Sequence, residues 1–282
     1  MLHKIVLFLV SCLLLLGVAY GYYYNRWKRL WAVTTPMHFY YVPHVEDDTL
    51  RVIMIGDSWA SIHSELQMDT FLSSKLEQMV HHPVSVISKG KGGEKSKGIY
   101  QLMFQTEDYG TKQLFINGAD YCIVLAGIND AAANLGTRQY CSHYRMILDF
   151  LLANNIRPVI VEIPDVNIWT IHGDKPKKDL LVDYMRSIMT GCRMYNYHEY
   201  REELYSMLQK EHLLEQVVYV SMSGWNSEED KLKPILSMAD RVHLNRLGYE
   251  RLDVCIATAI ARNLLQFCDS TSVNQPMDKK TQ

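Results

Sequence analysis

The chain has 282 residues, of which 48% are hydrophobic and 21% are charged. This composition supports one sizeable hydrophobic core and indicates a globular protein. The formal net charge of -2 provides no basic field for nucleic acid, and the sequence contains neither zinc-ligand spacing nor a phosphate-binding loop. We therefore expect no nucleic-acid partner, no metal and no cofactor.

The N-terminal segment is apolar enough to interact with a membrane. Residues 5–24 contain no charged side chain, and about 20 apolar residues are enough to cross a bilayer. Basic residues follow at 26, 28 and 29, with Trp27 and Trp31 nearby, as in a helix that ends at the membrane interface. The pattern favours an uncleaved anchor over residues 1–33, with the membrane as a partner through residues 5–24.

Other interpretations of this segment stay open. The triplet Ala19-Tyr20-Gly21 has the small-x-small pattern of a signal-peptidase site, and residues 9–12 faintly resemble a lipoprotein cleavage box. The positive-inside rule places the rest of the chain in the cytoplasm, whereas a short tail before the apolar run is typical of exported proteins. We expect a cell-envelope protein with an exported, membrane-anchored domain, or a secreted one if the segment is cleaved.

From residue 50 onward, short apolar runs alternate with longer amphipathic stretches. The short runs are rich in Val and Ile and almost free of charge, which predicts strands buried on both faces. The expected strands are 51–56, 83–88, 121–127, 157–164 and 216–222. The expected helices are 62–80, 95–106, 137–154, 199–214 and 247–265. The alternation predicts an α/β fold, a three-layer α/β/α sandwich around a five-stranded parallel sheet.

The same pattern predicts the domain organisation. A linker is expected over 34–49, the α/β domain over 50–266 and a polar tail over 267–282. The stretch 165–197 is too long for a simple crossover, so it is predicted to be an insertion over one end of the sheet.

Four polar clusters stand where predicted strands end. The first strand ends at Gly56-Asp57-Ser58, and the clusters SKGKGG (88–93), GIND (127–130) and DRVH (240–243) follow the second, third and fifth strands. Ligands of an open parallel sheet bind beyond the carboxyl ends of its strands. These clusters are therefore predicted to meet at one edge of the sheet.

In this order, the clusters resemble the sequence blocks of the SGNH family of esterases and lipases, also called GDSL hydrolases. The resemblance covers roughly residues 50–265 and implies the flavodoxin-like SGNH-hydrolase fold. It implies that Ser58 is the nucleophile and that Asp240 and His243 complete a catalytic triad. It also implies oxyanion donors at the backbone of Gly93 and the side chain of Asn129, in addition to the N–H of Ser58.

The chemistry of acyl transfer explains why these residue types are needed. A serine hydroxyl becomes a good nucleophile when a neutral imidazole accepts its proton, and that imidazole must be oriented through its other nitrogen. His243 is the expected base and Asp240 its orienting partner, three residues earlier in one loop. The sequence departs from the family pattern at Trp59, where Leu is usual, and at Ser88, where Asn is usual.

The expected function is a serine esterase that acts through an acyl-Ser58 intermediate. The family resemblance suggests small acyl esters, above all O-acetyl groups on carbohydrates such as polysaccharides. Three alternatives stay open: an O-acyltransferase in which a sugar hydroxyl replaces water, a lipase or thioesterase, and a binding module that has lost the reaction.

Overall fold

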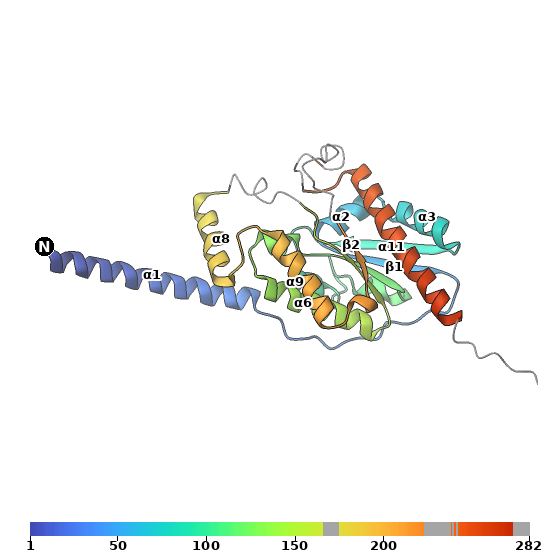
Figure 1. The fold of residues 1–282 in the computed structure, drawn as a ribbon, viewed down its shortest axis with the longest axis horizontal. Helices are drawn as coiled ribbons and strands as arrows, with labels where there is room; N and C mark the ends of the chain where they lie inside the picture. The colour runs from blue at the N-terminus through green and yellow to red at the C-terminus, as the bar shows by residue number, and fades with distance from the viewer. Residues whose placement is uncertain (166–174, 223–237, 239, 241, 273–282) are drawn as a thin grey trace, which may run out of the picture.

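The computed structural model describes residues 1–165, 175–222, 238, 240 and 242–272 (Figure 1). Part of the predicted insertion and most of the predicted polar tail lie outside these residues, as does much of the chain between the fifth strand and the DRVH cluster.

Five parallel strands form the central sheet, as predicted. The strands are β1 (Leu50–Gly56), β2 (Val84–Gly90), β3 (Tyr121–Leu125), β4 (Arg157–Val161) and β5 (Val218–Val220). Their order is β2-β1-β3-β4-β5, the doubly wound order of flavodoxin-like folds. Gly56 at the end of β1 pairs with Gly90 and with Leu125, the last residues of β2 and β3. The three strands therefore end at the same level, so the segments that follow them lie at one edge of the sheet.

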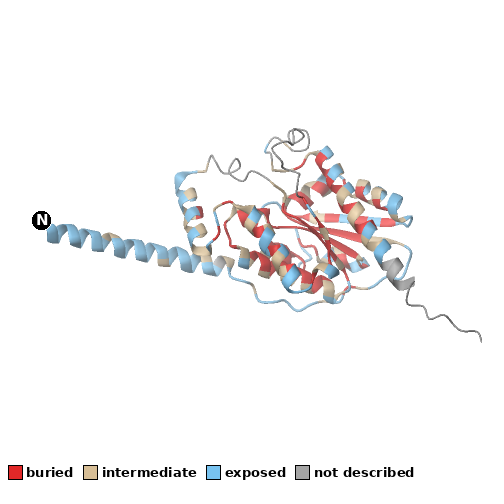
Figure 2. Ribbon diagram, viewed as in Figure 1, coloured by how far each residue is buried: buried red, intermediate tan, exposed pale blue. Residues whose placement is uncertain are grey.

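Helices cover both faces of the sheet (Figure 1). One layer contains α2 (Ser58–Glu65), α3 (Asp69–Val80) and α11 (Arg246–Ser272). The other contains α4 (Ser96–Leu102), α5 (Ile128–Ala132), α6 (Thr137–Ala153) and α9 (Tyr197–Lys210), and two 3-10 helices span Lys112–Asn117 and Leu214–Gln216. Buried residues fill the sheet and the inner sides of these helices (Figure 2), and Met54, Ile55 and Ile123 are fully buried. The predicted three-layer sandwich is confirmed.

The helix predicted over 62–80 is two helices. The first begins at Ser58, and it stops where Gln67 takes a positive φ of 57°. Because the chain turns at this break, the side chain of Met68 is fully buried in the core directly before α3 begins at Asp69. The break contains neither Gly nor Pro, so the sequence pattern does not predict where the helix is interrupted.

The segment before the sheet has no helix or strand but is packed on the body. The ring of Tyr40 lies against Phe104 and Phe150, and the backbone N–H of Met37 donates to the hydroxyl of Tyr100 at 2.8 Å. Residues 34–49 are therefore a strap along the domain rather than a free linker.

Two helices do not belong to the two helical layers of the sandwich. Helix α1 (Leu2–Trp31) projects from the body with its apolar stretch exposed (Figures 1 and 2), and its length and composition suit either a membrane span or a signal sequence. Helix α8 (Lys177–Thr190) belongs to the predicted insertion. It lies against the C-terminal end of α1, and its Arg186 also donates to the carbonyl of Ala133, directly after α5.

The close approach of β2 to α2 gives a stability prediction. A methyl group at Gly90 would collide with the backbone carbonyl of Asp57 and lie 2.6 Å from the N–H nitrogen of Ser61. Because the obstructing atoms are backbone, we expect Gly90→Ala to lower the free energy of unfolding by about 1–3 kcal/mol in urea denaturation. Gly92→Ala is the matched control, since its methyl meets nothing within 4 Å. Equal stability of the two variants would contradict this packing.

Candidate active site

The nucleophile candidate Ser58 is the first residue of α2, directly after β1. The side chain of Asp57 caps the helix by accepting the N–H of Trp59 at 2.9 Å. A side chain at Gly56 would collide with the carbonyl of Leu125, so only glycine lets β1 and β3 end this close together. Within the described chain, the N–H of Ser58 has no hydrogen-bond acceptor, as is usual in the first turn of a helix.

Ser58, His243 and Asp240 are brought together in one line of hydrogen bonds. The Nε2 atom of His243 lies 2.8 Å from Ser58 Oγ, and its Nδ1 atom lies 2.6 Å from Asp240 Oδ2. With the proton on Nδ1, the imidazole donates to Asp240 and accepts from Ser58. This is the arrangement that a serine needs to lose its proton during attack on a carbonyl.

The turn from Asp240 to His243 holds the carboxylate in place. Asp240 Oδ1 accepts the backbone N–H of Val242 at 2.9 Å and that of His243 at 3.0 Å. Partial burial works against the charge of Asp240, but these hydrogen bonds and the one from the imidazole outweigh it and lower its pKa. The carboxylate is therefore ionised when it orients the imidazole.

The loop after β2 offers a backbone donor. Gly93 has a φ of +72°, and its N–H has no acceptor among the described residues. The ammonium group of Lys95 donates to the carbonyl of Gly93 at 2.7 Å, and the N–H of Glu94 in that same peptide donates to the carbonyl of Lys91 at 3.1 Å, so both sides of the peptide that follows Gly93 are held.

Asn129 ties this loop to the nucleophile turn. Its side-chain nitrogen donates to Asp57 Oδ2 at 3.0 Å and to the carbonyl of Glu94 at 2.9 Å. Both amide hydrogens are therefore engaged in the free protein. An oxyanion that takes a hydrogen bond from Asn129 has to replace one of these two acceptors.

Two buried carboxyl groups lie beneath the site. Burial raises the pKa of Asp57 to about 7, although the hydrogen bonds from Trp59 and Asn129 oppose the shift. Burial likewise raises the pKa of Asp130 to about 6, against two hydrogen bonds from Ser96. Asp130 thus holds the start of α4 beside the site. The sequence reasoning gave Asp57 no role, although an Asp just before a helix is a recognisable N-cap.

A buried histidine lies behind the nucleophile helix. The Nε2 atom of His63 is 3.0 Å from Asp253 Oδ1, and its Nδ1 atom is 3.1 Å from Asp69 Oδ1 and from Ser88 Oγ. These groups come from α2, α3, β2 and α11. Burial disfavours the imidazolium, but the two carboxylates outweigh it and raise the pKa of His63 to about 9. No sequence motif links these positions.

A small cavity opens beside the nucleophile turn. Its volume is about 20 Å³, room for about one water-sized group. Trp59, Ile128 and Ile163 are among its lining residues, together with Asp57. Trp59 is only 3% exposed, and its indole N–H has no hydrogen-bond partner in the described chain. Trp59, which stands where Leu is usual, therefore forms part of the wall of this cavity.

Metal coordination has no visible support in the part of the chain that the structure describes. No group of three or more His, Cys, Asp or Glu side chains there is arranged to hold a metal ion.

A family model of GDSL-like lipases and acylhydrolases matches residues 54–251. The chain belongs to this family. The match spans every polar cluster at the sheet edge, and it establishes the protein as an ester hydrolase. None of the curated proteins compared with it is similar enough in sequence to count as a relative.

Solved structures share the fold at low sequence identity. The acetyl xylan esterase AlAXEase is 18% identical with a TM-score of 0.52, and the match covers 75% of this chain and all of the other. TesA is 12% identical with a TM-score of 0.50, over 74% of this chain and 97% of the other. A GDSL-like lipase from Bacteroides thetaiotaomicron is 14% identical with a TM-score of 0.49, over 85% and 97%.

The buried His63 cluster predicts a pH dependence of stability. Because the folded-state pKa of about 9 lies above the ordinary value of 6.5, this histidine stabilises the fold fully below pH 6.5. The contribution is lost as the pH rises through 9. We expect the free energy of unfolding to fall by on the order of 2 kcal/mol between pH 6.5 and 9.5, as measured by urea denaturation.

We expect His63→Gln to remove this decrease in the free energy of unfolding between pH 6.5 and 9.5. The control His82→Gln, a change at an exposed histidine, should retain the decrease. The same pH dependence in wild type and His63→Gln would show that another group is responsible.

Proposed function

We propose that this ester hydrolase is a serine esterase that removes small acyl groups, chiefly O-acetyl, through an acyl-Ser58 intermediate. The observation that carries the proposal is the continuous hydrogen-bond line from Ser58 Oγ through His243 to Asp240. A hydroxyl, an imidazole and a carboxylate in this order match the requirements of nucleophilic acyl transfer.

In the proposed first step, Ser58 Oγ attacks the ester carbonyl carbon while His243 Nε2 takes its proton. The carbonyl π electrons move to the oxygen and form a tetrahedral oxyanion. The imidazolium, stabilised by Asp240, then gives its proton to the departing alcohol oxygen as the C–O bond breaks. The products of this step are the free alcohol and acyl-Ser58.

In the proposed second step, water repeats the attack. His243 takes a proton from the water, whose oxygen bonds to the acyl carbon, and then returns the proton to Ser58 Oγ as the acyl bond breaks. The oxyanion is assigned to the N–H groups of Ser58 and Gly93, which have no other acceptor in the described chain, with Asn129 as the third donor. Each such donor typically contributes about 3–4 kcal/mol to the transition state.

The size of the cavity favours a short acyl group. A space of about 20 Å³ between Trp59 and Ile163 accommodates a methyl group but not a longer chain unless its walls move. The acetyl xylan esterase with the same fold bears a name that fits this preference. Acetylated carbohydrates are therefore our proposed substrates, with the domain exported and held at the cell envelope by α1.

Ser58→Ala tests the nucleophile. We expect the wild-type chain, solubilised in uncharged detergent, to hydrolyse p-nitrophenyl acetate and to be labelled by a fluorophosphonate. Ser58→Ala should lose labelling and on the order of 10⁴-fold or more in kcat/KM. Ser61→Ala is the matched control, since this serine lies one turn further along α2 and bonds to Glu65 instead. Labelling of Ser58→Ala would disprove the role of Ser58, and an unlabelled, inactive wild type would favour the binding module.

Acyl length tests the substrate class. We expect kcat/KM to fall at least tenfold from p-nitrophenyl acetate to the butyrate, because the cavity beside Trp59 has no room for the added methylenes. Trp59→Phe should raise the butyrate rate relative to the acetate rate of the same variant. A rate that rises with chain length would instead assign lipid esters, and acetylated sugar formed faster than acetate in the presence of an acceptor sugar would assign the transferase.

A further inference from the structure

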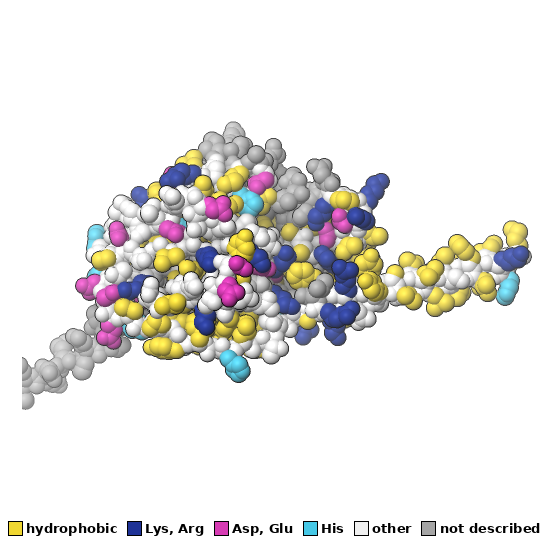
Figure 3. Space-filling model, turned by 180° about the vertical axis from the view of Figure 1, so that it is seen from behind, with side chains coloured by type: hydrophobic (Ala, Val, Ile, Leu, Met, Phe, Trp, Pro, Cys, Tyr) yellow, Lys and Arg dark blue, Asp and Glu magenta, His cyan; other side chains and the backbone are white. Residues whose placement is uncertain are grey.

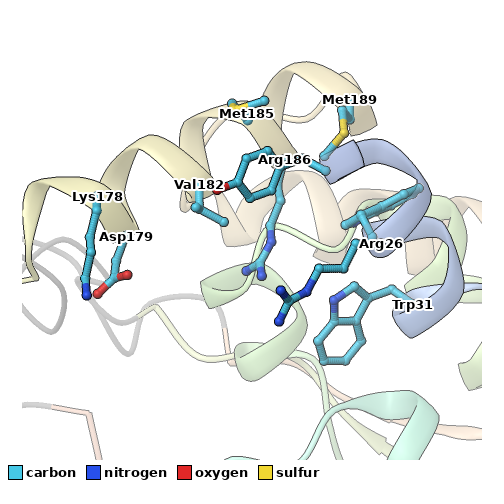
Figure 4. A pocket seen from close by; sticks show the side chains of 10 residues that line it. Arg26, Trp31, Lys178, Asp179, Val182, Met185, Arg186 and Met189 are labelled. Atoms are coloured by element: carbon cyan, nitrogen blue, oxygen red, sulfur yellow. The ribbon is translucent and has the colours of Figure 1, made fainter. Parts of the chain in front are cut away.

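A second, larger pocket lies away from the active site, between α1 and α8. Its volume is about 330 Å³, within the range of small-molecule sites. Figure 4 shows side chains from both helices around it. Its polar side chains include Arg26 from α1 and Lys178, Asp179 and Arg186 from α8. The pocket therefore has three cations and one carboxylate, which makes it a site for an anion.

The cations of this pocket are poorly neutralised by the protein. Figure 4 shows the guanidinium groups of Arg26 and Arg186 directed into the same space. Arg186 shares Asp183 with Lys175, at 3.3 Å and 2.9 Å respectively. Arg26 and Lys178 have no ion pair with any described residue. Two positive charges directed at one space repel each other, and an anion bound between them would offset this repulsion.

Neutral donors add to the anion-binding character. The indole N–H groups of Trp27 and Trp31 are buried, and neither has a hydrogen-bond partner in the described chain. Both residues line the pocket. A buried N–H without an acceptor is costly, so a ligand rich in acceptor oxygens would remove that cost.

The position of the pocket indicates where the anion comes from. It lies at the C-terminal end of α1, the helix whose apolar stretch is long enough to cross a bilayer. Lys and Arg side chains gather on the side of the body from which α1 projects (Figure 3), and Lys28 and Arg29 lie in the last turn of α1. The adjoining face of α8 exposes the apolar side chains of Leu181, Tyr184 and Ile188, as expected for a helix lying at a lipid surface.

We propose that the pocket between α1 and α8 binds the phosphate of an anionic phospholipid, such as phosphatidylglycerol, in a protein that retains α1. Arg26 and Arg186 neutralise the headgroup phosphate, Lys178 adds a cation further along the pocket (Figure 4), and the indoles of Trp27 and Trp31 donate to the phosphate oxygens. The lipid thereby fixes α8, and with it the body, against the membrane surface. This binding is independent of the esterase reaction.

The test uses the full chain in micelles of an uncharged maltoside detergent. Titration calorimetry with dioctanoyl phosphatidylglycerol measures binding, and dioctanoyl phosphatidylcholine, glycerol 3-phosphate and inorganic phosphate are titrated in parallel. Arg26→Gln and Lys178→Gln each remove one cation from the pocket, and both side chains are exposed, so the fold does not depend on them. Arg29→Gln and Lys177→Gln are matched controls that remove the same charge from the same helices outside the pocket.

We expect phosphatidylglycerol to bind at least fivefold more weakly to each pocket variant and unchanged to each control, with weaker binding of phosphatidylcholine. Equal weakening in pocket and control variants would overturn the proposal in favour of a diffuse basic surface. Binding of inorganic phosphate or glycerol 3-phosphate as tight as that of the lipid would overturn it in favour of a soluble phosphate. Absence of phosphatidylglycerol binding to the wild type would overturn it outright.

Discussion

The buried carboxyl group of Asp57 joins the three segments on which the active site depends. One oxygen caps α2 and so fixes Ser58 at the sheet edge, and the other accepts the amide of Asn129. The same amide holds the carbonyl of Glu94, so the loop that contains Gly93 is tied to the nucleophile turn. Because Asp57 is almost fully buried, these hydrogen bonds compensate for its lost hydration, and each partner is held firmly.

The proposed triad brings together residues 185 positions apart, and the packing of α11 makes this possible. The hydroxyl of Tyr249 on α11 donates to the carbonyl of Trp59 on α2 at 2.9 Å. Asp253, one turn further along, pairs with His63. Displacing either partner of this pair would leave an uncompensated charge in the core. The register of α11 against α2 is therefore strongly specified, and the loop that carries His243 immediately precedes α11.

The segment after β4 connects the candidate active site with α8. Ile163 and Pro164 line the small cavity beside the nucleophile turn, and the chain then continues to α8, which lies against α1. Arg201 anchors the beginning of this segment through the carbonyl of Ile163 and through Asp165. Under the anchoring by α1 that we propose, this connection suits an ester hydrolase that acts on substrates close to the membrane surface.

The sequence by itself determined the sheet and its functional edge. Uncharged Val- and Ile-rich runs have to be buried on both faces, which predicts parallel strands, and parallel strands carry the segments that follow them to one edge. That reasoning grouped the polar clusters that contain Ser58, Asp240 and His243, and the family resemblance selected these three residues within them. The tertiary structure decided what depends on contacts between distant segments: the break at Gln67, the His63 cluster, the engagement of both Asn129 amide hydrogens, and the position of α8 beside α1. None of these has a local pattern, because burial of Met68 in the core and pairing across four elements are properties of the packed chain.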